Sequence, residues 1–279
     1  MNKFLIIILT SLFLTMPVLA KTDKTSVDYL KNKKHFAVIN PIAENFVEKL
    51  IKKALKEHVG KFKYKAKFEI YTLSSLKKGI FKRAEITAYD FSFDNIPIKY
   101  VNIKSLDEYI WIDVKSDPMK FKSDANLEYK IELTEESINA ALDKKDYQKK
   151  LSKINNIAYP LFSIHDLNIY IKNNYFVFLM SYSLPLSSSN KIKTFTAASD
   201  FIIDNGKIKV DNIKVDKAYS KMPLHKIANL LNLLDPLTFT ISELTDNKCK
   251  SKIESVKVED NIIKINGKIF IKGSTEISK

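Results

Sequence analysis

Long runs of this chain alternate apolar and polar residues. In residues 62–72, FKYKAKFEIYT, aromatic and aliphatic residues occupy nearly every second position, and lysines or a glutamate fill the others. A period of two is typical of a strand with one buried face. Short turn sequences such as Asn173-Asn174 and Asp204-Asn205-Gly206 join successive runs, which predicts antiparallel pairing. Parallel winding would need a helix after nearly every strand, and too few segments have helical spacing.

The first helical pattern follows Pro41. Residues Ile42–Val59 predict an amphipathic helix, on which Phe46, Leu50 and Leu55 share an apolar stripe opposite a row of lysines. This stripe suits either a helix packed in a core or one wall of an apolar groove.

Two further helices are predicted from a change of period. A strand at 126–133 turns into a helix at Thr134, which is a favourable N-cap, and an interruption is expected near 143–146. The second, Leu224–Leu234, is apolar on most of its circumference, and Asp235-Pro236 is expected to end it. The run 175–180 is apolar on both faces, which predicts a strand buried on two sides.

These patterns predict an α+β protein in which a long, curved antiparallel sheet wraps around a few amphipathic helices. Residues 21–40 form a polar lead-in, and residues 41–279 form a single elongated domain. Because helix and strands recur in the same order, two similar halves, 41–118 and 119–279, are a hypothesis of internal duplication.

Residues 1–20 have the pattern of an export signal. Lys3 is followed by the apolar run Phe4–Leu14, and Val18-Leu19-Ala20 supplies small residues before a cleavage point at Lys21. The apolar run is shorter than the ~20 residues that span a bilayer. The sequence therefore predicts an exported protein, periplasmic or extracellular, associated with the cell envelope.

The charge is strongly positive but carried by lysine. The chain has 46 basic and 32 acidic residues, and Arg83 is its only arginine. Base reading and bidentate phosphate binding favour arginine, so nucleic acid is not an expected partner. A spread of lysines would favour approach to an anionic membrane surface. Cys249 is the only cysteine, which excludes a disulfide within the chain.

The sequence lacks the motifs of common catalytic and cofactor sites. It contains no P-loop, no G-x-G-x-x-G, no H-E-x-x-H and no G-x-S-x-G. His165-Asp166 is the only neighbouring pair of histidine and carboxylate, and adjacent residues of a strand point to opposite faces. We therefore expect a binding protein rather than an enzyme, with no cofactor and no metal.

Abundant apolar-faced sheet predicts an exported α+β binding protein, and a lipid is one ligand that such a sheet could hold. A lipid carrier must hide acyl chains from water, at about 0.8 kcal/mol per methylene. A filled core requires the same alternation as an open cleft, so the two stay alternatives for each candidate. The candidate lining residues are Phe46, Leu50, Leu55, Phe176, Phe178, Met180, Leu230, Leu231 and Leu234.

At Leu133–Leu142, LTEESINAAL, the chain resembles the LmeA-like phospholipid-binding family. The strands in Gly79–Ile98, the helix Pro223–Leu237 and the hairpin Ile253–Gly267 are also similar to that family. The resemblance implies phospholipid binding outside the cytoplasm, no catalytic residue, and a fold distantly like tubular lipid-binding domains. The lysine-rich, glycine-poor composition and the polar lead-in depart from the family.

The expected function is that of a soluble phospholipid-binding or lipid-transfer protein that holds acyl chains in an apolar cleft between helices and sheet. The alternative is a non-catalytic envelope module that binds a protein partner and has a dry, packed interior. A hydrolase would require a polar cleft with clustered carboxylates.

Overall fold

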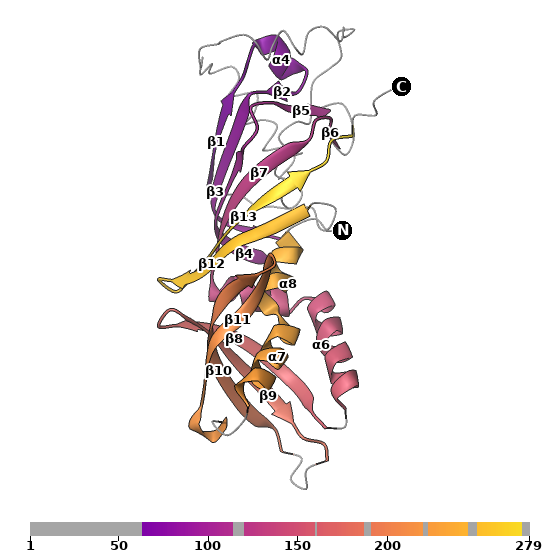
Figure 1. Ribbon diagram of the computed structural model, residues 1–279, viewed down its shortest axis with the longest axis vertical. Helices are drawn as coiled ribbons and strands as arrows, with labels where there is room; N and C mark the ends of the chain where they lie inside the picture. Colours follow the sequence, from indigo (N-terminus) through magenta and orange to yellow (C-terminus); the bar gives the residue numbers. More distant parts are fainter. Residues whose placement is uncertain are drawn as a thin grey trace.

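The computed structural model describes residues 63–113, 120–159, 161–186, 191–219, 223–244 and 250–274. The export signal, the lead-in and the helix predicted at 42–59, with Phe46, Leu50 and Leu55, lie outside these residues. The described chain is an elongated α+β structure in which all strand pairs are antiparallel (Figure 1), as predicted. Its strands form three sheets where the sequence predicts one long sheet, and the wrapping of sheet around helices stays a prediction.

A six-stranded sheet forms one end of the molecule. Its strand order is β1-β3-β4-β7-β13-β12. These strands are β1 (Lys63–Glu69), β3 (Arg83–Phe93), β4 (Ile96–Ser105), β7 (Ala125–Leu133), β13 (Ile262–Ile271) and β12 (Lys250–Glu259). The C-terminal hairpin thus pairs with β7, and the sheet takes strands from both sides of residue 118. The two halves, 41–118 and 119–279, remain a hypothesis of duplication. They do not correspond to the two large sheets, because the six-stranded sheet contains strands from both halves.

A smaller sheet and a short helix close the far end of the six-stranded sheet. The small sheet has the order β2-β5-β6, made of β2 (Ile80–Phe81), β5 (Ile110–Asp113) and β6 (Lys120–Phe121), and it lies next to α4 (Leu73–Lys77). The alternation in residues 62–72, 81–93, 96–103 and 109–114 predicts a meander of four strands. Its last strand is predicted wrongly, because β5 pairs with β2 and β6 instead of β4. After β4 the chain leaves the large sheet and forms β5, which pairs with β2. The chain then returns to the large sheet as β7, which pairs with β4 on the side away from β3.

The other end contains a four-stranded sheet, order β11-β10-β9-β8, with helices beside it (Figure 1). The strands are β8 (Ser163–Lys172), β9 (Tyr175–Ser183), β10 (Lys193–Asp204) and β11 (Lys207–Val215). The helices are α5 (Glu135–Leu142), α6 (Lys145–Ala158), the 3-10 turn η1 (Lys217–Tyr219), α7 (Leu224–Leu234) and α8 (Pro236–Leu244).

Helix α8 was not expected from the sequence. Asp235 does end α7, in a left-handed conformation with φ 43°, but Pro236 then begins α8 at once. Proline suits the first position of a helix because its missing N–H would have no partner there. The Asp-Pro pair therefore ends one helix and starts the next.

The two faces of the six-stranded sheet differ in polarity. On the outward face Glu85 lies opposite Lys104, Lys104 opposite Glu128, and Glu128 opposite Lys268, so opposite charges alternate across four strands. On the inward face the side chains are apolar and buried. The buried apolar residues of both sheets form one continuous cluster.

Strand β12 joins the two sheets. It packs against β10 and β11, and the turn residue Asp260 donates its backbone N–H to Asn174 Oδ1 in the β8–β9 turn, at 3.2 Å. Figure 1 shows these two hairpin turns side by side at the middle of the molecule. The inner faces are therefore continuous across the joint.

Helix α5 begins as predicted, at Thr134. The Thr134 backbone N–H donates to Ser137 Oγ at 2.9 Å, and Ser137 N–H donates to Thr134 Oγ1 at 3.3 Å, which completes a capping box. The predicted interruption is confirmed, since α5 ends at Leu142 and α6 starts at Lys145.

Side chains from α5 and α6 satisfy the free edge of β8. Asn139 accepts from the Ile169 N–H and donates to the Ile169 carbonyl, both at 2.8 Å. Asn155 makes the same pair of bonds with Ile164, at 2.8 and 2.7 Å, and Glu135 accepts from the Ile171 N–H at 3.0 Å. An edge strand with unpaired groups tends to pair with other chains, and these side chains block that pairing.

Asn139→Ala is expected to lower the free energy of unfolding by about 2–3 kcal/mol, because it leaves the Ile169 N–H and C=O without partners. Denaturant unfolding followed by circular dichroism measures the loss. Asn156→Ala is the matched control, since Asn156 is exposed on α6 and reports the gain in helix propensity alone. Equal stabilities for the two variants would show that water replaces the Asn139 amide.

Candidate functional site

Three of the predicted lining residues lie on the inner face of β9. Phe176 and Phe178 are 0% exposed and Met180 is 2% exposed. The Phe176 ring is 5.1 Å from that of Phe178 and 5.0 Å from that of Phe201, with both pairs edge-on. Edge-to-face contacts of this kind add to the stabilisation that burial provides.

Helix α7 contributes the other predicted residues. Leu231 and Leu234 are fully buried, whereas Leu230 is only half-buried and packs at the margin of the core. The structure therefore brings five of the candidates, Phe176, Phe178, Met180, Leu231 and Leu234, into one buried apolar cluster. Contact with lipid stays a prediction for all of them.

The outer face of β9 differs from the expectation of burial on two sides. Tyr175, Val177 and Leu179 are half-buried, and Tyr170, which pairs with Val177, is 43% exposed. The apolar run is therefore fully buried on one face only. The sequence could not distinguish these cases, because apolar residues on a solvated sheet face follow the same pattern as buried ones.

Three titratable groups gather where α6 meets the corner between α7 and α8: the buried Tyr147 and the half-buried Lys150 and Asp235. The Leu234 carbonyl accepts from Tyr147 Oη at 3.0 Å and from Lys150 Nζ at 2.9 Å. Burial raises the pKa of the Tyr147 hydroxyl and lowers the pKa of the Lys150 ammonium. Burial also raises the pKa of Asp235, whose carboxylate accepts a hydrogen bond from Thr238. These bonds attach α6 to the corner, which is a structural role.

One contact joins a serine and a histidine. His165 Nε2 lies 2.8 Å from Ser183 Oγ, while the neighbouring Asp166 accepts from Asn168 Nδ2 at 2.6 Å. A serine nucleophile needs its histidine oriented by a third group, and within the described residues no carboxylate is shown bonded to His165. The two neighbours His165 and Asp166 thus bond different residues, and the pair does not form a catalytic arrangement.

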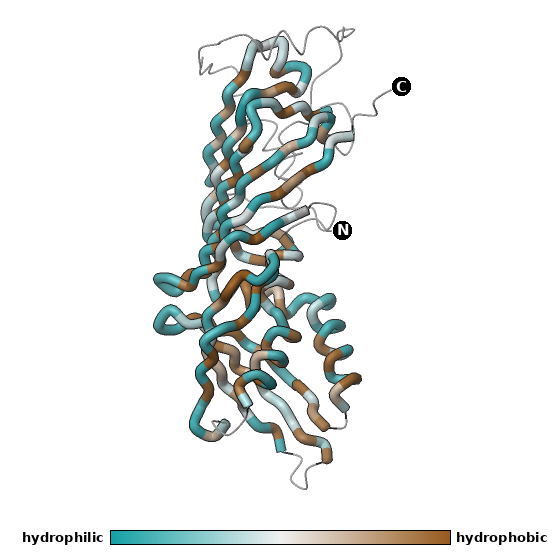
Figure 2. Tube along the Cα trace, viewed as in Figure 1, coloured by the Kyte–Doolittle hydropathy of each residue, from teal (hydrophilic) through white to brown (hydrophobic). Residues whose placement is uncertain are grey.

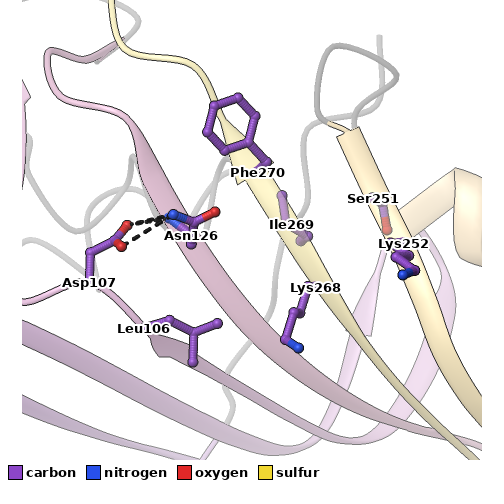
Figure 3. A pocket seen from close by; sticks show the side chains of 8 residues that line it. All are labelled: Leu106, Asp107, Asn126, Ser251, Lys252, Lys268, Ile269 and Phe270. Carbon is purple, nitrogen blue, oxygen red and sulfur yellow. Dashed lines mark hydrogen bonds between the residues drawn. The ribbon is translucent and has the colours of Figure 1, made fainter.

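A shallow hollow lies where β7, β13 and β12 meet the loop after β4 (Figure 3). Its volume is about 430 Å³, and its lining combines apolar side chains with two lysines. Asp107 accepts from Asn126 N at 2.6 Å and Nδ2 at 3.1 Å, so its carboxylate is occupied. Lys268 pairs with Glu254 at 2.7 Å. The lining residues are Leu106, Asp107, Asn126, Ser251, Lys252, Lys268, Ile269 and Phe270.

The hollow is open, its lining is mostly apolar, and one of its two lysines is already in an ion pair, so its lining does not identify a ligand. Sequence reasoning did not find it, because it depends on the register of β12 against β13 and of β13 against β7. Its residues come from segments more than a hundred positions apart, and no local pattern marks them.

In the described part of the chain no three His, Cys, Asp or Glu side chains are grouped to hold a metal ion. Among these residues no helix has the length and apolarity to cross a membrane. The chain matches no protein-family model, no curated protein and no solved structure. The resemblance to the LmeA-like family therefore stays a prediction from the sequence.

Proposed function

We propose that this protein is an exported phospholipid-binding or lipid-transfer protein of the cell envelope, related to the LmeA-like family. The observation that carries the proposal is the single apolar cluster formed by buried residues of both large sheets and of the helices. A lipid in water needs such a surface along the whole of its acyl chains.

The length of the six-stranded sheet is sufficient to cover an acyl chain. Strand β3 has 11 residues, and at 3.4 Å per residue an extended strand of this length spans roughly 37 Å. Half of a bilayer's hydrocarbon core is only about 15 Å thick. The inner face is therefore long enough to cover an extended acyl chain.

In this proposal the sheets curve around amphipathic helices, and acyl chains lie between helix and sheet. The helix predicted at 42–59 lies outside the described residues, and its apolar stripe is a further candidate for contact with acyl chains. Phe46, Leu50 and Leu55 are its candidate contacts, and Phe176, Phe178 and Met180 are those on β9, with Leu230, Leu231 and Leu234 on α7.

A non-catalytic envelope module that binds a protein partner is the second candidate. The outer face of the four-stranded sheet favours it, because Tyr170, Val177 and Leu179 leave apolar surface open to solvent there. This candidate requires the interior to be filled by the protein's own side chains.

The protein purified without detergent is expected to carry phospholipid in a stoichiometric amount. Native mass spectrometry, followed by solvent extraction and analysis of the extract, measures this, and lipid-stripped protein should take up labelled phospholipid from vesicles. Heat-denatured protein in the same vesicles is the control for non-specific adsorption. Absence of both bound lipid and uptake would refute the proposal, and one stoichiometric protein partner without lipid would favour the second candidate.

A further inference from the structure

The end of the molecule away from the six-stranded sheet exposes five large apolar side chains. Ile157, in the last turn of α6, is 86% exposed, and the other four are 67–70% exposed. We call this set the apolar end, and it consists of Ile157, Tyr159, Leu161, Leu186 and Ile192. It holds half of the ten large apolar side chains that are exposed in the described chain.

Strand pairing brings these residues to one place. Ser163 at the start of β8 pairs with Ser183 at the end of β9, and Tyr182 of β9 pairs with Lys193 at the start of β10. The residues just outside these strands therefore share one end of the sheet, where α6 also finishes. Figure 1 shows this at the lower end of the molecule, and Figure 2 shows hydrophobic segments there.

Hydrogen bonds hold the backbone of the turn between α6 and β8, which carries part of the apolar end. Leu161 and Phe162 both donate their backbone N–H groups to the Ala158 carbonyl, at 3.0 and 3.2 Å. The Asn155 amide makes two bonds to the backbone of Ile164, and the Phe162 ring stacks on Tyr182 at 5.1 Å. The outward position of the Leu161 side chain is therefore fixed by the turn between α6 and β8.

The two segments that carry the apolar end contain charges of one sign. Residues 147–165 and 181–199 contain five lysines and no aspartate or glutamate. Lys191 and Lys193 flank Ile192 directly, and Lys153 precedes Ile157 by one helical turn; all three lysines are exposed. Among the described residues no ion pair includes them, whereas Lys264 and Lys268 on the six-stranded sheet pair with glutamates.

We propose that the apolar end docks on anionic phospholipid bilayers. The five apolar side chains enter the boundary between headgroups and acyl chains, and Lys153, Lys191 and Lys193 contact headgroup phosphates. Exposed apolar residues beside unpaired lysines are the combination that interfacial membrane binding uses. The inference rests on the proposed function, because docking brings the protein to the lipid that it would carry.

A bilayer fits this surface better than a protein partner. Each apolar side chain is mainly surrounded by solvent, so a protein partner would need a separate pocket for every one of them. A fluid interface takes up such protruding side chains without a matched shape, and its negative charge complements the lysines.

Flotation of the full chain with vesicles tests the proposal. Wild-type protein is expected to bind vesicles of phosphatidylglycerol mixed with phosphatidylcholine and to bind pure phosphatidylcholine weakly. Lys191→Glu with Lys193→Glu should weaken binding to the anionic vesicles by at least about tenfold. Ile157→Ser with Leu161→Ser should have an effect of similar size, at least about tenfold, through lost apolar burial.

Matched variants elsewhere serve as controls. Lys65→Glu with Lys67→Glu changes the charge equally on β1, and Ile202→Ser removes a side chain that is 46% exposed near the other end of β10. Both should leave vesicle binding within about twofold of wild type, because neither site belongs to the apolar end. The charge change on β1 is in addition screened, since charges interact little beyond a Debye length of about 8 Å. Melting curves confirm that each variant is folded.

The outcomes separate docking from lipid carriage. Wild-type protein that carries lipid but does not float with anionic vesicles would overturn the docking proposal alone, and so would equal losses in control and test variants. A concentration-dependent dimer that Leu161→Ser abolishes would assign the apolar end to a second copy and overturn it too. Vesicle binding that the test variants abolish, in a protein that never carries lipid, would support docking and refute the proposed function.

Discussion

Replacing Phe178 by alanine is expected to lower the free energy of unfolding by about 3–5 kcal/mol. The ring is fully buried and lies between Ile169 of β8 and Ala197 of β10 in the strand pairing. The small Ala197 leaves room for the ring, and the Phe176 ring contacts it edge-on. Truncation would leave a cavity bordered by paired strands, which cannot close to fill it.

Guanidinium unfolding followed by fluorescence or circular dichroism measures this loss. Val177→Ala is the control, because Val177 is the next residue on the half-buried outer face and should cost about 1 kcal/mol. Measuring lipid uptake by Phe178→Ala beside its stability also distinguishes a lipid-binding interior from a filled core. A small loss in Phe178→Ala, together with greater lipid uptake, would place the ring on a lipid chamber; a large loss without any change in uptake would place it in a filled core.

Gly267→Ala is expected to cost about 3 kcal/mol or more, since overpacking that moves the backbone lies at the upper end of such effects. A Cβ atom on Gly267 would lie 2.5 Å from the Lys252 carbonyl oxygen and 2.5 Å from Tyr129 Oη. The first of these is backbone of the paired strand β12. Tyr129 is fully buried on β7, directly opposite Gly267. Neither neighbour can move without separating strands on that side.

Thermal unfolding compared with Lys268→Ala checks this prediction. Lys268 is the next residue of β13 and is exposed, and its surface ion pair with Glu254 is worth about 0–1 kcal/mol. A Gly267→Ala protein as stable as Lys268→Ala would mean that β7 and β12 adjust to the methyl group. The absence of a side chain at Gly267 would then be incidental to the position of Tyr129.

Local features of the fold were readable from the sequence. Alternation located the strands of both large sheets, because burial of one face requires it. Asn and Asp marked the hairpin turns at 173–174 and 204–206, where Asn174 and Asn205 take positive φ. Thr134 marked the start of α5 through its hydroxyl. Each of these depends on residues within a few positions of one another.

Hairpin pairing across the Asn173-Asn174 and Asp204-Asn205-Gly206 turns was readable, whereas pairing between strands that are far apart in the chain was not. Nothing near β5 shows that it leaves the large sheet, and nothing near β7 shows that β13 pairs with it. Burial of the candidate site residues was not readable from the sequence for the same reason, since it also depends on distant parts of the chain. Phe178 and Leu161 are both apolar residues in apolar surroundings by sequence, yet one is buried and the other is 70% exposed. The apolar end was therefore missed. Five of the candidate lining residues lie on buried faces, and their contact with lipid stays a prediction.

Because β7 lies between β4 and β13, its two edges can pair only at different times during synthesis of the chain. Pairing of β7 with β4 is available early, since little chain separates the two strands. Its other edge pairs Leu133 with Ile263, which leaves the ribosome only after the whole four-stranded unit has been made. The contact order of this pairing is high, and such contacts form slowly and leave strand edges open to aggregation in the meantime. The six-stranded sheet therefore closes last, and chaperone protection would matter most before β13 arrives.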